Sequence, residues 1–193
     1  MTQFSSLIQS ARDQWQWRGQ ARPPFAAVPG PGQTSVWDFP RPPLLEVDAR
    51  EVVIRWGDVE VARTRRVVLV LETSHPPSFY LPWDDVARHL LMPAKGSSFC
   101  EWKGPAQYWS LERDLEGDTP NGGKQQLLNV AWSYPQPMAG AELLANCVAF
   151  YPAPLDCRVD GAAVQAQPGG FYGGWITPEL VGPFKGEPGS TGW

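Results

Sequence analysis

Two short stretches of the chain combine reactive polar side chains with aromatic rings. One holds the thiol of Cys100 and the ammonium of Lys103, and the other, earlier in the chain, holds the carboxylate of Glu72 and the imidazole of His75. A thiol near an ammonium can ionise more easily and become a nucleophile. A carboxylate at the mouth of a buried strand would have a raised pKa, which suits a general base. These residues predict a candidate catalytic set, with Cys100 as nucleophile or redox thiol and Glu72 or His75 as base.

Each of these side chains also has a purely structural interpretation. Cys100 fits a small buried thiol within an aromatic cluster. Lys103 fits an ordinary ion pair with Glu101 or Glu72, and it fits equally an ammonium offered to an anionic ligand. Glu72 has candidate counterions in three arginines that follow the second expected strand. These are Arg63, Arg65 and Arg66.

Aromatic residues gather around the same stretches and around a third one, residues 131–137. Rings on turn-rich backbone are typical of a pocket rim. The rings in question are Trp102, Tyr108, Trp109, Trp132 and Tyr134. They predict a binding module in which these rings line a pocket and Glu72 and Lys103 fix a small polar ligand or a peptide. The alternative is a metal-independent enzyme that acts on a small molecule through Cys100 or Glu72, and both hypotheses assume that the three stretches converge in space.

Several other classes of function lack the residues that they need. The chain has no Cys-x-x-Cys pair and its two histidines lie far apart in sequence, so we expect no metal site and no cofactor. A net charge of −4 without a basic run argues against nucleic acid, and no apolar run is long enough to span a membrane. Three cysteines cannot all pair, and the start of the chain lacks the pattern of a secretion signal, so we expect a cytoplasmic protein with reduced thiols.

The composition predicts a mainly β fold, because 21 prolines and 19 glycines among 193 residues favour short strands joined by turns. Residues 52–56 alternate in polarity, Gly57-Asp58 suits a two-residue turn, and the alternation resumes at Val59, which indicates a hairpin. Val67 to Leu71 is a continuous apolar run typical of a buried strand. We therefore expect three successive antiparallel strands.

Further strands are expected on the C-terminal side of a short helix that begins near Pro82. Periodic apolar residues indicate these strands, and a polar loop over residues 113–124 separates the first two. They are expected over residues 107–112, 126–133, 147–151 and 158–164, the last turned at Asp160-Gly161.

The two ends of the chain read as straps around a single core domain. We expect a short helix within residues 1–19 that docks its apolar face on the domain, and a proline-rich strap from Gln20 to Pro43. The resulting division is 1–44 for helix and strap, 45–166 for the core and 167–193 for a second strap. The alternative is that the N-terminal strap reaches a second subunit, which would give a homodimer. In the tail, paired glycines beside aromatic residues would let rings lie flat on backbone.

Several segments, in their order along the chain, resemble a bacterial family catalogued as domain of unknown function 427. They are Val68–Glu72 with Phe79–Pro82, Cys100–Gly104 with Tyr108-Trp109, Ala131–Pro135 and Val148–Tyr151. The resemblance implies a β-tent fold, with small antiparallel sheets that meet at an angle. Relatives of that fold often hold zinc through two Cys-x-x-Cys pairs, which this chain lacks.

The same family sometimes carries a nucleotidyltransferase label. That chemistry requires a Gly-Ser loop followed by spaced carboxylates that hold magnesium. Gly96-Ser97 precedes acids that fall in the expected loop, while Asp58 and Glu60 have suitable spacing but come before it. Nucleotidyl transfer therefore ranks below the other two hypotheses.

Overall fold

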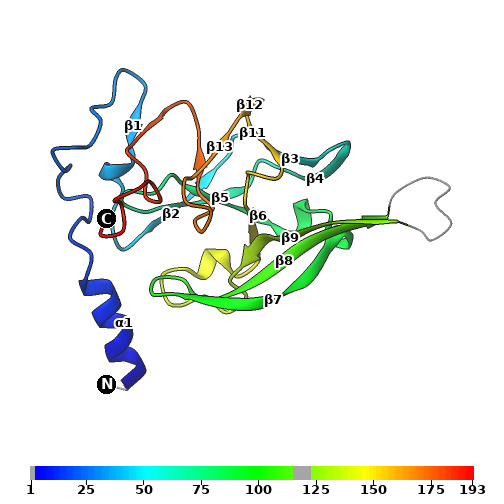
Figure 1. Ribbon diagram of the computed structural model, residues 1–193, viewed down its shortest axis with the longest axis horizontal. Coiled ribbons are helices and arrows are strands. Elements are labelled where there is room, and N and C mark those ends of the chain that lie inside the picture. Colours follow the sequence, from blue (N-terminus) through cyan, green and yellow to red (C-terminus); the bar gives the residue numbers. More distant parts are fainter. Residues whose placement is uncertain (1–2, 115–122) are drawn as a thin grey trace.

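The computed structural model describes residues 3–114 and 123–193 and is mainly β, with small antiparallel sheets in a β-tent-like arrangement (Figure 1). This confirms the fold class expected from the sequence. Most of the expected loop over residues 113–124 lies outside the described residues. No helix in the described part of the chain is both long enough and apolar enough to cross a membrane.

The larger sheet has seven strands in the order β2-β5-β6-β10-β9-β8-β7. Its last three strands form a long arm that extends from the body of the molecule (Figure 1). In sheet order the strands are β2 (Leu44–Asp48), β5 (Val67–Leu71), β6 (Ser78–Pro82), β10 (Cys147–Phe150), β9 (Lys124–Ser133), β8 (Gly104–Asp114) and β7 (Leu91–Cys100).

The smaller sheet has four strands and contains both expected hairpins. Its order is β12 (Ala162–Ala163), β11 (Asp156–Val159), β3 (Val52–Trp56) and β4 (Val59–Thr64). Gly57 turns the first hairpin with φ +62°, a conformation that glycine adopts without strain. Apolar residues of this sheet and of the larger one form a single buried cluster, so the two sheets pack on each other across the core.

The expected run of three successive antiparallel strands is wrong at its third member. β5 does not pair with β4 but lies between β2 and β6 in the larger sheet. All five residues of β5 are buried: Leu69 belongs to the core between the sheets, and Val70 belongs to a second cluster on the opposite face. A strand that is apolar on both faces needs cover on both faces, and β5 has it, because the smaller sheet packs on one face and the second cluster covers the other.

Other differences concern the elements around β5. Strands β6 and β7 were not predicted from the sequence. In place of the expected helix after Pro82 the chain forms two short 3₁₀ turns, η2 (Trp83–Asp85) and η3 (Arg88–Leu90). Two more 3₁₀ turns are η1 (Val36–Asp38) and η4 (Glu142–Leu144). Because β7 ends at Cys100 and β8 begins at Gly104, the reactive stretch is the tip of a hairpin.

The two terminal straps are joined to each other on one side of the molecule (Figure 1). β1 (Thr34–Ser35) pairs in parallel with β15 (Leu180–Val181), and β13 (Gln165–Ala166) pairs with β14 (Trp175–Ile176). An aromatic cluster ties the straps together through ring contacts. It consists of Trp17, Phe25, Trp37 and Trp193.

The single α-helix in the described part of the chain, α1 (Gln3–Asp13), projects from the body (Figure 1). The side chain of Leu7, on its expected apolar face, is 64% exposed. The expected docking of this face on the domain is therefore wrong at Leu7. Arg12, near the end of the helix, contacts the domain by donating to the Glu101 carbonyl oxygen, and Trp15, after the helix, donates to the Glu101 carboxylate.

Candidate functional site

The three reactive and aromatic stretches meet at a cavity of about 220 Å³. It lies on the face of β5 and β6 opposite the main core, and the hairpin tip between β7 and β8 forms one of its sides. Seven of the residues singled out in the sequence line it. They are Glu72, His75, Cys100, Lys103, Tyr108, Trp132 and Tyr134.

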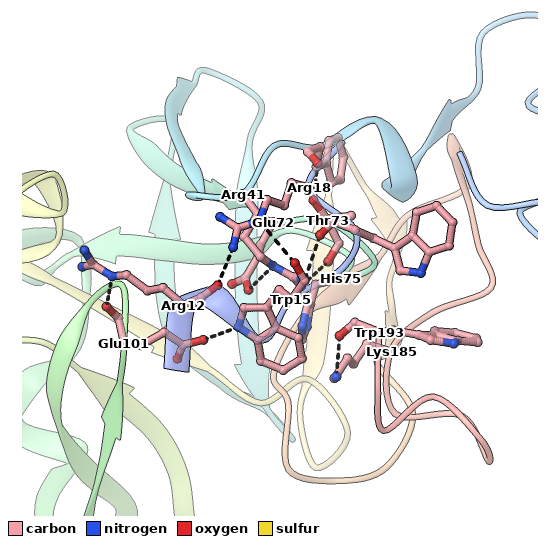
Figure 2. Close-up of polar contacts among 12 residues, drawn as sticks. Arg12, Trp15, Arg18, Arg41, Glu72, Thr73, His75, Glu101, Lys185 and Trp193 are labelled. Atoms are coloured by element: carbon pink, nitrogen blue, oxygen red, sulfur yellow. Dashed lines mark hydrogen bonds and ion pairs between the residues drawn. The ribbon is translucent and has the colours of Figure 1, made fainter. Parts of the chain in front are cut away.

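Glu72 follows β5 directly and is held by a buried arginine. Arg41 Nε lies 3.2 Å from Glu72 Oε1, and the same guanidinium donates to the carbonyl oxygens of Trp17 and Thr73 (Figure 2). The expected counterions were the wrong arginines, because Arg63 in β4 and Arg65 and Arg66 directly after it pair with acids elsewhere. The partner comes from the N-terminal strap, which the local sequence around Glu72 does not reveal.

The pKa of Glu72 shifts in the direction opposite to the one expected. Burial raises the pKa of this carboxyl, but the Lys103 ammonium, together with the charge and the hydrogen bond of Arg41, outweighs burial and leaves the pKa below its ordinary value. Glu72 is therefore a carboxylate at neutral pH. It can orient a cation or accept a hydrogen bond, and it is a weaker proton acceptor than the sequence suggested.

Lys103 lies on the hairpin tip with its ammonium 3.7 Å from Glu72 Oε2. This distance is too long for a hydrogen bond, so the pair is held by charge alone and the N–H donors remain available to the cavity. Burial lowers the pKa of Lys103, but attraction to Cys100 and Glu72 outweighs burial and leaves the pKa above its ordinary value. Lys103 is thus a charged donor in the cavity wall.

His75 is fixed in one tautomer by its neighbour Gln167. The Gln167 amide nitrogen donates to the carbonyl oxygen of Lys185 at 2.8 Å, and its amide oxygen accepts from the main-chain nitrogen of Gly174, which orients the amide. The same nitrogen lies 2.9 Å from His75 Nδ1, which must therefore accept and leave the proton on Nε2. Burial lowers the pKa of His75 to about 4, so the ring is neutral at pH 7.

Cys100 ends β7 and is the one cysteine of the three that lines the cavity. Cys147 and Cys157 are buried in the core clusters, and burial raises the pKa of both thiols, that of Cys147 to about 11. Cys100 is partly exposed. The structure thus separates one accessible thiol from two that are sequestered.

Trp132 forms a wall of the cavity through contacts on two sides. Its indole nitrogen donates to the Tyr80 hydroxyl at 2.9 Å. Its ring lies against Gly173, where an added Cβ atom would stand 2.1 Å from the ring. A glycine at this position therefore permits the close approach of the ring to the backbone of the tail.

Trp102 and Trp109 do not line the cavity, in contrast to the expectation from the sequence. Successive residues of a strand point to opposite faces, so Trp109 turns away where Tyr108 faces the cavity. Trp109 packs on Trp83 and donates to the Ser133 hydroxyl. Trp102 is buried under the guanidinium of Arg12, 4.8 Å from its ring centre.

A family model described as a domain of unknown function (DUF427), with the short label NTP_transf_9, matches residues 44–164. The chain belongs to the DUF427 family. The resemblance seen in the sequence is therefore confirmed. No curated protein matches the chain significantly.

The part of the chain that matches DUF427 supplies only some of the cavity walls. Trp15 from the N-terminal strap and Tyr172 and Lys185 from the tail complete them. The Trp15 ring centre lies 4.6 Å from the Arg41 guanidinium carbon and 4.4 Å from the Lys185 ammonium, and its indole nitrogen donates to Glu101 (Figure 2). These residues were not predicted as site residues. The Gly-aromatic pattern of the tail was the only feature of the sequence that pointed toward this part of the cavity.

The described DUF427 residues do not form the site that a magnesium-dependent nucleotidyltransferase needs, and the acids at positions 116 and 118 of the expected loop lie outside the described residues. Among residues 3–114 and 123–193, no three His, Cys, Asp or Glu side chains lie close enough together to hold a metal ion. Asp58 pairs with Arg113 and Glu60 pairs with Arg63, both outside the cavity. We derive no nucleotidyl-transfer step from this arrangement.

Proposed function

We propose that the DUF427 cavity binds a small polar ligand, fixed by Lys103 and Glu72 and enclosed by aromatic side chains. The observation that carries the proposal is the Lys103 ammonium, which lines the cavity, pairs with Glu72 only at 3.7 Å and keeps donors for a ligand. A cavity with apolar walls and a few convergent polar groups is the usual form of a small-molecule site. The free thiols suit the reducing cytoplasm, where we place this function.

The aromatic side chains give the proposed ligand a rigid enclosure. Tyr108 is hydrogen-bonded to Ser98 at 2.8 Å, and Trp132 is held by Tyr80. Tyr134 is buried beside them. Rigid walls lower the entropy cost of binding, because few side chains must be ordered when the ligand enters.

A thermal-shift screen against metabolites, dipeptides and nucleotides, with and without Mg²⁺, tests the proposal. We expect a ligand that raises the melting temperature of the parent but not of Lys103→Met. Lys124→Met is the matched control, since it removes an exposed ammonium on the arm, and it should keep the shift. Glu72→Gln tests the carboxylate in the same way once its fold is verified. If every hit shifts Lys103→Met as much as the parent, the proposed site is wrong.

The position of Cys100 favours a second candidate function, a metal-independent enzyme that uses this thiol on a small molecule. It is the cavity-lining thiol, while the other two are buried. His75 could serve as base only weakly, because its pKa is about 4. This candidate predicts that iodoacetamide modifies Cys100 at least tenfold faster than Cys147 or Cys157. Equal and slow modification of all three thiols would eliminate it.

A further inference from the structure

A second cavity, of about 460 Å³, lies directly beside the first. The two spaces are adjacent because five residues line both of them. These are Tyr108, Tyr151, Gln167, Phe171 and Tyr172. We refer to the first space as the inner cavity and to the second as the outer groove.

The outer groove lies where two strand pairings of the arm, β7 with β8 and β8 with β9, depart from regular register. The pairing of β7 with β8 shifts register between Pro93 and Ser97, where Gly96 has φ +98°. The pairing of β8 with β9 shifts near Asn129, which has φ +52° and whose main-chain nitrogen donates to the Ser110 hydroxyl. Bulges are frequent next to functional sites because they redirect side chains, and both of these bulges contribute groove residues.

The inner cavity is suited to a group that carries a single negative charge. Lys103 offers more free N–H donors than its neighbours, because Lys185 gives two of its three donors to main-chain oxygens and Arg41 also donates to main-chain oxygens. The cavity lining holds the ammonium groups of Lys103 and Lys185 and the carboxylates of Glu72 and Glu101, and the guanidinium of Arg41 lies beside Glu72. These three cations face two carboxylates, so a ligand group with one negative charge balances the site and a group with two or more does not. A carboxylate satisfies these conditions better than a phosphate.

The outer groove is suited to an apolar extension of the same molecule. Its floor and rim include Pro152, Ala153, Pro154 and Phe171. The inner cavity alone is smaller than the roughly 300 Å³ at which ligand pockets usually begin, and the two spaces together fall within the usual range. A ligand that filled both would place a polar head at Lys103 and an apolar tail along the groove.

We infer that the inner cavity and the outer groove form one site for an elongated monocarboxylate. Its carboxylate lies at Lys103, and its apolar chain lies between the arm and the C-terminal strap. The inference rests on the proposed function and specifies its ligand class. Each methylene of the tail that the groove buries should tighten binding by about fourfold.

Calorimetric titration of the full chain with propanoate, hexanoate and octanoate tests the inference, with octanamide as the neutral analogue. We expect octanoate to bind at least tenfold more tightly than propanoate, and octanamide at least tenfold more weakly than octanoate. Ala153→Trp fills the groove from an exposed position, so it should weaken octanoate at least tenfold and change propanoate less than twofold. Ala139→Trp, at an exposed position outside both spaces, is the matched control and should behave as the parent.

The outcomes separate this inference from the proposed function. Equal affinity for propanoate and octanoate, or no effect of Ala153→Trp, overturns the inference, while loss of propanoate binding in Lys103→Met would still support the inner cavity. Equal binding of octanamide overturns the assignment of the charged head. If none of the three alkanoates binds, the inference is overturned, and the metabolite screen decides separately on the proposed function.

Discussion

Acidification should destabilise this protein through His75 before its carboxylates titrate. The pKa of His75 falls from 6.5 in an exposed setting to about 4 in the folded protein. Between these values the unfolded chain takes up a proton and the folded chain does not, so stability is fully present above pH 6.5 and is lost as the pH falls toward 4. Integration from pH 7 to pH 5 gives a loss of about 2 kcal/mol in the free energy of unfolding.

Urea denaturation at pH 7, 6 and 5 would measure this loss. His75→Asn offers an oxygen that can accept from Gln167 but cannot titrate, so its stability should fall by about 2 kcal/mol less than that of the parent over this range. The matched control, His89→Gln, removes an exposed histidine and should keep the parental pH dependence. Titration of the other carboxylates contributes equally to the loss in the free energy of unfolding of all three proteins. If His75→Asn loses as much stability as the parent, the assignment of the neutral buried ring is refuted.

Three further substitutions test the walls of the cavity, each through the free energy of unfolding in urea. Gly173→Ala should cost about 1–3 kcal/mol, because the new Cβ overlaps the Trp132 ring; a neutral effect would mean that the ring does not rest on this backbone. Arg41→Met should cost about 3 kcal/mol by leaving Glu72 with Lys103 as its nearest cation, and a stabilising effect would contradict the pairing. Trp15→Ala should cost about 2 kcal/mol from lost packing and cation contacts, and no loss would argue against its role in closing the cavity.

The sequence predicted best where side-chain alternation and turn residues agree. The hairpin of β3 and β4 turns at Gly57, and that of β11 and β12 turns at Asp160-Gly161, both as expected. The family resemblance and the mainly β class were also predicted correctly. These features depend on local pattern, which is what a single sequence records.

The sequence did not reveal which strands pair with one another over long distances along the chain, and β5 shows why. Its apolar run indicated burial, but nothing in the run showed that β5 pairs with β2 and β6 in the larger sheet instead of with β4. The same limit applies to the site. Glu72 and Lys103 were predicted as site residues and both line the cavity, whereas Arg41, the partner of Glu72, lies in a proline-rich strap without any local signal. Lys185 was not predicted, because its contact with Trp15 joins opposite ends of the chain.

The strap pairing also sets the order in which the cavity can be assembled during synthesis. The indole nitrogen of Trp37 donates to the carbonyl oxygen of Pro183, 146 residues further along the chain, so this contact can form only after residue 183 has been synthesised. Until Lys185 has been synthesised, Trp15 has no Lys185 ammonium beside it. At that stage Glu72, directly after β5, and Lys103, at the hairpin tip, face water. Contacts of such high sequence separation form slowly. A nascent chain can therefore hold most of the β core while the cavity still lacks the wall that the C-terminal strap supplies.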